Sequence, residues 1–289
     1  MWPVFSNTIK TPHRTGRPSI TDRQTRAKHR LMCPACDTES PFDKAMRTPH
    51  LYLPLDLAAG LVVPLPREKV HYLKRVLRQR PGAPLSVFNG HGGQFQADLS
   101  PDGDQILVRE YQDEERESPL AITLIQGISR GERMEFTLRK ATELGVSRVL
   151  PITTSRCEVK LQGNRLEKRL AHWHGILVSA CEQCGRNRLP DLPAPQTLDQ
   201  ALTGFQTGPG DTLGLMLDPL ASHSLPDFPV PGGSVVLLVG PEGGLSPGEI
   251  ASTARAGFVG VRLGPRILRT ETAPLAALAA IQVLWGDLA

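Results

Sequence analysis

The chain has 289 residues, of which 40% are hydrophobic and 21% charged, the proportions of a folded globular protein rather than a disordered one. It contains no apolar run of the roughly 18 residues that a membrane-spanning helix needs, and its N-terminus lacks the apolar core of a secretory signal. The net charge of +4 is uneven, because residues 1–45 carry eight basic and four acidic side chains whereas residues 46–289 carry 25 of each. We therefore expect a cytoplasmic protein with a neutral body, in which any nucleic-acid contact uses a local basic patch.

Residues 1–45 form a distinct first segment. They are rich in Thr, Pro, Arg and Ser and show no hydrophobic period, which predicts a disordered basic extension. A passive tail is our expectation. Attraction to RNA phosphates and a misplaced start codon are the alternatives.

Short strands follow. Leu51–Leu53, Pro84–Asn89, Gln94–Leu99 and Gln105–Tyr111 read as strands, and Asn-Gly, Gly-Gly and Pro-Asp-Gly turns lie among them. Several short strands at this spacing indicate a small β-barrel, which we place at residues 46–114.

A basic helix is predicted at Glu68–Arg78, with Val70, Leu73 and Leu77 on one side. Its region contains one acid, Glu68, and six basic residues: Arg67, Lys69, Lys74, Arg75, Arg78 and Arg80. Most charge runs are solvated faces, but the rest of the body is neutral. We therefore expect Lys74, Arg75 and Arg78 to contact RNA phosphates.

An acidic, proline-ended linker at 113–119 marks a domain boundary, after which strands and helices alternate through residues 119–289. The strands are Ala121–Ile128, Val149–Ile152 and Thr212–Leu217, and the helices are Glu132–Leu144 and Arg165–Arg186. This alternation predicts an α/β domain with a parallel sheet covered on both faces.

The most informative stretch is 234–249. The unbroken apolar run Ser234–Val239 is typical of a strand buried on both faces, and it ends abruptly in Gly240-Pro241-Glu242-Gly243-Gly244. A capping box then begins a helix, with Ser246 as N-cap, Pro247 first in the helix and Glu249 three residues after the cap. The glycine-rich loop therefore lies at the carboxyl end of a strand, where open α/β sheets bind ligands.

A second loop of this kind follows the predicted strand Val259–Leu263. It runs through Gly264–Thr272 into a helix at Ala273–Trp285. If the two strands are neighbours, both loops face one crevice; two ordinary βα turns are the alternative. Neither loop is a Walker A motif or a G-x-G-x-x-G fingerprint.

Four of the five cysteines form C-x-x-C pairs, Cys33 with Cys36 and Cys181 with Cys184. A four-thiolate zinc site is one interpretation. Cys181 and Cys184 fall three residues apart in a predicted helix, where packing is the more common role, so we expect no metal.

Four stretches of the chain together resemble one enzyme family. They are Ser129–Phe136, Ala180–Arg188, Leu238–Leu245 and Leu263–Ala273, in that order. The last two resemble the S-adenosylmethionine site of the SPOUT methyltransferases. All four resemble the RsmE family, which methylates N3 of a uridine in small-subunit ribosomal RNA, and the resemblance runs from about Met46 to the C-terminus.

The resemblance implies a PUA-like RNA-recognition barrel at 46–114 and a SPOUT α/β domain at 119–289 whose parallel sheet carries a trefoil knot. It further implies S-adenosylmethionine as cofactor, 16S rRNA of the small ribosomal subunit as substrate, and a homodimer. The function expected is that of a 16S rRNA (uracil-N3)-methyltransferase. A catalytically silent RNA-binding or ribosome-assembly protein, or a methyltransferase of another RNA, are the alternatives.

Cofactor contacts are implied from three loops. The residues are Met216, Leu217, Gly240, Pro241, Glu242, Gly243, Leu263, Gly264, Leu268, Arg269 and Thr270. Arg186, in the polar cluster that ends the apolar helix, is expected to reach RNA or a neighbouring chain's site. A solvated helix end is the alternative for this cluster.

The chemistry suggests catalytic roles for Arg269 and Glu271. Uracil N3 lies between two carbonyls, so loss of its proton places negative charge on O2 and O4. A fixed guanidinium near those oxygens, from Arg269, lowers that cost. Glu271 accepts the proton or orients Arg269, and Glu242 is the other candidate carboxylate. The alternative is that Arg269 and Glu271 merely form an ion pair at the start of a helix.

Overall fold

The computed structural model describes residues 48–159, 161–205 and 212–288. The predicted disordered extension at 1–45 and the pair Cys33 and Cys36 lie outside these ranges. None of the described helices combines the length and the apolarity that a bilayer crossing requires.

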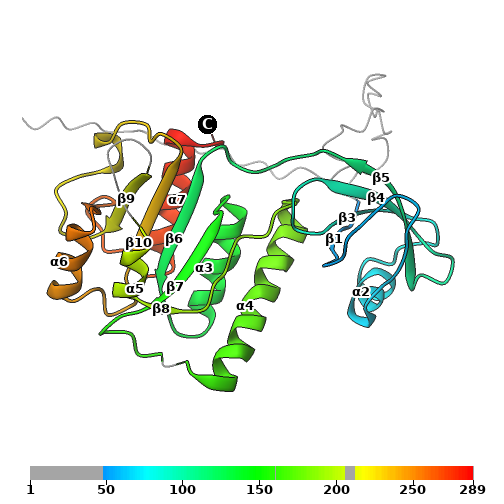
Figure 1. Cartoon of the computed structure of the whole chain (residues 1–289), viewed down its shortest axis with the longest axis horizontal. Coiled ribbons are helices and arrows are strands. Elements are labelled where there is room, and N and C mark those ends of the chain that lie inside the picture. Colours follow the sequence, from blue (N-terminus) through cyan, green and yellow to red (C-terminus); the bar gives the residue numbers. More distant parts are fainter. Residues whose placement is uncertain (1–47, 160, 206–211, 289) are drawn as a thin grey trace, which may run out of the picture. The chain divides into compact units, whose positions relative to one another are not determined.

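The first sheet is a curled, mixed sheet of five strands (Figure 1). Its strands are β1 (His50–Tyr52), β2 (Val62–Pro64), β3 (Pro84–Phe88), β4 (Gln94–Leu99) and β5 (Gln105–Gln112). The hydrogen-bonded order is β1-β3-β4-β5-β2, with β1 parallel to β3 and the other pairs antiparallel. No pairing of β1 with β2 closes a ring among the described residues, so the predicted barrel is found as a curled sheet.

The predicted basic helix is present but irregular. It consists of α2 (Arg67–His71) followed by a π-helical turn, η1 (Tyr72–Val76), which buries Leu73 in the core of the first sheet. Lys74, Arg75 and Arg78 are exposed, as the RNA-contact hypothesis requires. Lys69 is different, because its ammonium group pairs with the carboxylate of Glu182.

The second sheet contains six parallel strands in the order β11-β9-β10-β6-β7-β8 (Figure 1). The strands are β6 (Ala121–Gly127), β7 (Arg148–Thr153), β8 (Gln196–Thr197), β9 (Thr212–Leu217), β10 (Ser234–Val239) and β11 (Val259–Val261). The predicted parallel sheet is thus confirmed. β11 ends two residues earlier than expected, at Val261.

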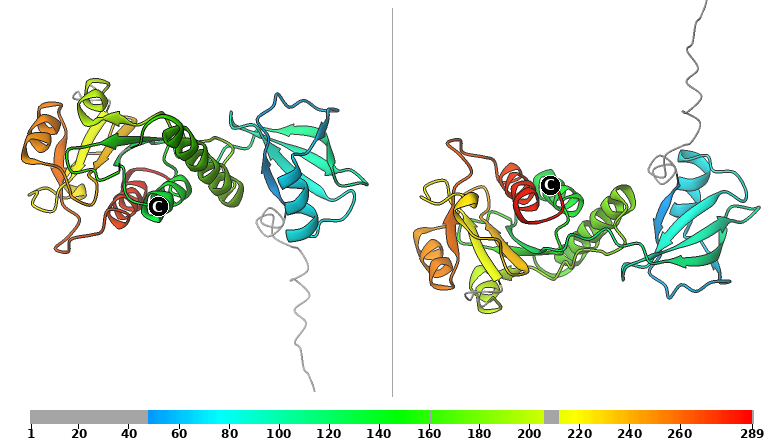
Figure 2. Two further views of the ribbon diagram at one scale, coloured as in Figure 1. Left: turned by 90° about the horizontal axis from the view of Figure 1, so that it is seen from below. Right: turned by 90° about the horizontal axis from the view of Figure 1, so that it is seen from above.

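Helices cover both faces of this sheet, as Figure 2 shows. On one face lie α3 (Glu132–Glu143), α4 (Gly163–Cys184) and α7 (Thr272–Trp285); on the other lie α5 (Leu198–Thr203) and α6 (Pro247–Arg255). In β10, Val235, Leu237 and Val239 pack on the face covered by α3, α4 and α7, whereas Val236 and Leu238 pack on the face covered by α5 and α6. An unbroken apolar run is therefore required, because both faces of the strand are buried.

Arg186, two residues after the end of α4, does not lie where the sequence predicted. The expectation that it reaches RNA or a neighbouring chain is wrong. Arg186 is 4% exposed. Its Nε donates to Oε1 of Glu117 at 2.8 Å, and its Nη1 donates to the carbonyl oxygens of Thr142 and Val146 at 2.8 and 3.0 Å. The guanidinium is therefore buried and hydrogen-bonded within the protein, which excludes both contact with RNA and a solvent-exposed position at the helix end.

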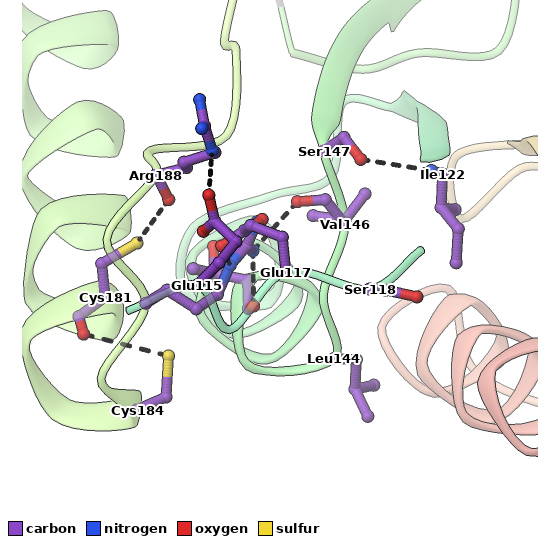
Figure 3. A network of polar contacts seen from close by, with 12 residues as sticks. Glu115, Glu117, Ser118, Ile122, Leu144, Val146, Ser147, Cys181, Cys184 and Arg188 are labelled. Atoms are coloured by element: carbon purple, nitrogen blue, oxygen red, sulfur yellow. Dashed lines mark hydrogen bonds and ion pairs between the residues drawn. The ribbon is translucent and has the colours of Figure 1, made fainter. Parts of the chain in front are cut away.

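The acidic linker is tied down beside this buried pair. Nε of Arg188 donates to Glu115 at 2.8 Å (Figure 3). The side-chain amide of Asn187 donates to the carbonyl oxygen of Glu114 at 2.9 Å. The carboxylates at 114–117 therefore anchor the boundary between the two sheets rather than extending freely into solvent.

The two helical cysteines pack as thiols. Sγ of Cys181 donates to the carbonyl oxygen of Arg188, and burial raises the pKa of Cys181 to about 12 (Figure 3). Burial likewise raises the pKa of Cys184. Metal ligation needs thiolates, so these environments fit packing.

Candidate active site

The two predicted loops meet at the carboxyl ends of three neighbouring strands, β9, β10 and β11. The hydroxyl of Thr270, in the second loop, donates to the carbonyl oxygen of Gly240, in the first, at 3.0 Å. A cavity of about 700 Å³ opens between the loops. The alternative of two unrelated βα turns is therefore wrong.

The predicted capping box stabilises the end of the first loop, where α6 begins. The side chain of Ser246 accepts from the backbone N–H of Glu249, and the Glu249 carboxylate accepts from the backbone N–H of Ser246 at 2.7 Å. The same carboxylate accepts from the backbone N–H of Ser155 at 2.7 Å. Partial burial would raise the pKa of Glu249, but these hydrogen bonds lower it below its usual range. The start of α6 is thereby fixed to the loop that follows β7.

The second support of this loop is Arg156, which the sequence analysis did not identify. Its Nη1 donates to the carbonyl oxygens of Gly243 and Leu245, at 3.1 and 3.2 Å. A Cβ at Gly243 would lie 3.0 Å from Cβ of Arg156. Gly243 is therefore a packing position behind the loop, and it is not among the residues that line the cavity.

A third contact comes from the end of β6. A Cβ at Gly127 would lie 2.3 Å from the backbone nitrogen of Pro241, a separation that real side chains do not reach. Glycine is thus required at this position by close approach of two backbone segments, and the Gly240–Pro241 turn rests directly on it.

We expect Gly127→Ala to weaken cofactor binding at least about tenfold, because the added methyl group displaces the Gly240–Pro241 turn that walls the cavity. The free energy of unfolding should fall by about 1–3 kcal/mol from overpacking. Gly175→Ala in α4 is the matched control, since a Cβ there meets no atom within 4 Å. Calorimetric titration checks the result; unchanged affinity in Gly127→Ala would show that the turn does not shape the binding site.

Arg133, on α3, links the carboxylates at one edge of the cavity. Its Nη1 donates to Oε1 of Glu242 at 3.1 Å, and its Nε lies 3.9 Å from Oε2 of Glu271. The backbone N–H of Arg130 also donates to Glu242, at 3.0 Å. Although partial burial opposes the change, these bonds lower the pKa of Glu242 below its usual range. Glu242 is therefore held as a carboxylate, which makes it a poor proton acceptor at neutral pH.

The proposed catalytic pair has a geometry that the sequence did not predict. Arg269 is exposed and lines the cavity, whereas Glu271 is half-buried at its edge. Within the described part of the chain, the ion-pair partner of Glu271 is Arg133 and not Arg269. The alternative of a merely structural Arg269–Glu271 ion pair is therefore wrong.

Ten of the eleven predicted cofactor-binding residues line this cavity. They are Met216, Leu217, Gly240, Pro241, Glu242, Leu263, Gly264, Leu268, Arg269 and Thr270. Arg133 lines it as well. It lies in the stretch Ser129–Phe136 that carried the resemblance, but no local signal marked it as a site residue.

Comparison with known proteins agrees with this site. The profile of the RNA methyltransferase domain family matches residues 116–282, more than half of the chain, and that of the RNA methyltransferase PUA domain matches residues 65–111. Ribosomal RNA small subunit methyltransferase E of Buchnera aphidicola subsp. Schizaphis graminum is 34% identical over 245 residues, which cover 84% of this chain and 98% of the relative. The chain belongs to the ribosomal RNA small subunit methyltransferase E (RsmE) family.

Solved structures add the cofactor. The RsmE enzyme of Neisseria gonorrhoeae, bound to S-adenosylmethionine, is 42% identical with a TM-score of 0.76, covering 84% of this chain and 100% of that one. A Legionella pneumophila methyltransferase in complex with the same cofactor is 39% identical with a TM-score of 0.78, covering 83% and 99%. As a member of the RsmE family, this chain is an RNA methyltransferase whose cofactor is S-adenosylmethionine.

The cavity fits this cofactor chemically. Its volume falls within the range of about 300–1,000 Å³ typical of small-molecule sites. Apolar side chains that suit an adenine ring line it, among them Leu217, Leu263 and Leu268. Carboxylates and guanidiniums at its edge, including Glu242 and Arg269, complement the cationic and anionic groups of a sulfonium amino acid.

Proposed function

We propose that this protein methylates N3 of a specific uridine in 16S rRNA of the small ribosomal subunit. The observation that carries the proposal is the single cavity at the ends of β9, β10 and β11, walled by both predicted loops, in a chain of the RsmE family. We propose that the ten predicted residues lining it contact the cofactor.

The bound cofactor supplies a methyl group on a sulfonium sulfur, which keeps the electron pair of the broken carbon–sulfur bond. The chain's own residues manage the acceptor. Arg269, exposed at the cavity, places its guanidinium toward the uracil carbonyl oxygens and stabilises the negative charge that develops as N3 loses its proton.

Glu271 is our choice for the proton acceptor. Glu242 already accepts hydrogen bonds from Arg130 and Arg133, which stabilise its ionised form. Glu271 has a longer contact, with 3.9 Å between its Oε2 and Nε of Arg133, and this oxygen is buried without a hydrogen-bond partner in the described residues. Glu271 lines the cavity and retains accepting capacity that Glu242 has already used, which favours Glu271 as the proton acceptor.

Methyl transfer to small subunits tests the function. Small ribosomal subunits from cells lacking the protein, incubated with purified protein and tritiated-methyl cofactor, should become labelled, and mass mapping should locate one added methyl group on a single uridine base. Labelling of transfer RNA instead would reject the substrate, and no labelling of any RNA would favour a catalytically silent protein.

We further propose that the curled first sheet (46–114) recognises RNA, and that Lys74, Arg75 and Arg78 contact its phosphates. Replacing all three with Ala should weaken RNA binding and flatten its salt dependence by up to about 0.9 in log–log slope for each lost duplex contact. Replacing Arg165, Lys168 and Arg255, three exposed basic residues on α4 and α6, is the charge-matched control. Equal slopes in the two triple variants would remove this patch from the RNA surface.

Three finer features complete the proposal. The segment after β11 is threaded as the trefoil knot of SPOUT enzymes. Two observations support this: the hydroxyl of Thr270 donates to the carbonyl oxygen of Gly240, and the helix that follows, α7, packs beside α3. The enzyme is a homodimer, supported by the exposed Val283 and Leu284 on α7; a single-chain mass by light scattering would reject this. We propose that it acts in the cytoplasm, where its proposed ribosomal substrate is found.

A further inference from the structure

A second cavity, of about 560 Å³, adjoins the cofactor cavity along α3. It is lined by Glu132, Arg133, Glu135, Phe136, Arg139 and Glu271. Arg133 and Glu271 line both cavities, so the two spaces meet at this ion pair. A ligand in the second cavity would therefore lie beside the cofactor cavity, with Arg133 and Glu271 between them.

The position of Phe136 follows from the packing of α3. The helix buries Met134, Leu138 and Ala141 against the sheet. At about 100° per residue, Phe136 lies on the opposite side of the helix from this buried face, and its side chain is 43% exposed. A single exposed aromatic residue is ordinary on a protein surface, but this ring lines a cavity that borders the cofactor site.

The charged residues around the Phe136 ring differ in whether they are engaged in ion pairs. Glu135 is engaged by Nη1 of Arg169 at 3.2 Å and Nε2 of His172 at 3.0 Å, and Arg133 is engaged by Glu242. Arg139, one turn after Phe136, is exposed at the rim. An exposed aromatic ring beside an exposed guanidinium is the combination that proteins use to stack an unpaired base and hold its phosphate.

We propose that the second cavity holds the acceptor nucleotide, with its pyrimidine ring stacked on Phe136 and its phosphate at Arg139. The base then presents its reactive nitrogen across the Arg133–Glu271 boundary, between the proton acceptor and the methyl donor. This inference rests on the proposed function and adds the binding site for a pyrimidine nucleotide extruded from the RNA. Stacking also explains how a base is held although the pocket walls are largely charged.

The test compares Phe136→Ala with Phe136→Trp, which retains a stacking surface. In methylation of small subunits, Phe136→Ala should lower kcat/KM about 10-fold to 100-fold, the range expected when one stacked base is lost, and Phe136→Trp should restore most of it. Cofactor affinity should stay within about twofold in both variants, since Phe136 does not line the first cavity. Arg139→Ala should raise KM for RNA, whereas Arg165→Ala on α4 should not.

A photochemical experiment locates the base directly. A small-subunit RNA with 5-iodouridine at the methylated position, irradiated with the wild-type enzyme, should cross-link to a peptide containing Phe136, and the cross-link should be lost in Phe136→Ala. Unchanged kcat/KM in Phe136→Ala, a cross-link to another element, or an altered oligomeric state of that variant would overturn the assignment while leaving the proposed function intact. If the wild-type enzyme labels no uridine, the proposed function fails, and this inference fails with it.

Discussion

Arg269→Ala should lower kcat by about 100-fold to 1,000-fold at saturating cofactor, the effect typical of removing one group that stabilises developing negative charge. Arg269 is exposed and lines the cavity, and α7 begins three residues later at Thr272. Its carbonyl oxygen accepts from the backbone N–H groups of Thr272 and Ala273, and alanine retains both bonds. The loss should therefore fall on chemistry and not on folding.

Steady-state kinetics with small subunits separates the possible roles of Arg269. A higher KM for cofactor with unchanged kcat would assign the guanidinium to cofactor binding and deny it a part in the chemical step. Arg269→Lys should recover only part of the rate, because an ammonium group cannot engage two acceptors in one plane. Arg255→Ala, an exposed arginine on α6 outside the cavity, serves as the control for lost charge.

Arg186→Ala should lower the free energy of unfolding by about 3–5 kcal/mol, the cost of leaving a buried charge without its partner. The substitution removes both hydrogen bonds to Glu117 and those to the carbonyl oxygens of Thr142 and Val146. Urea denaturation followed by circular dichroism measures the loss.

The neighbouring Arg188 provides the matched control. Its side chain is half-exposed and pairs with Glu115, so Arg188→Ala should cost less than about 1 kcal/mol. A double variant, Arg186→Met with Glu117→Gln, should recover part of the stability by removing both charges. If Arg186→Ala and Arg188→Ala destabilise the protein equally, the guanidinium of Arg186 is not buried in solution as it is in this structure.

Local patterns were sufficient to predict the elements around the site. The apolar run Ser234–Val239 and the capping box of Ser246 and Glu249 each involve residues that are close in sequence. The strand β10 spans this apolar run, and α6 begins at its capping box. The glycine-rich turn between them could be placed at a strand end for the same reason.

Contacts between distant segments could not be predicted in this way. The sequence does not show that β9 lies between β10 and β11, an order that brings Met216 and Leu217 to the same cavity as the two loops. Gly127 looked like the end of an ordinary strand, and its role depends on Pro241, more than a hundred residues later. Arg186 was misjudged because charged residues are usually exposed, and its partner Glu117 lies 69 residues away.

A crystal structure of this protein with S-adenosylmethionine bound tests the central claim most directly. We predict the cofactor between the Gly240–Leu245 and Leu263–Glu271 segments, with its methyl group directed toward the Arg133–Glu271 edge. A cofactor bound outside these two segments, or a methyl group directed away from that edge, would contradict the account.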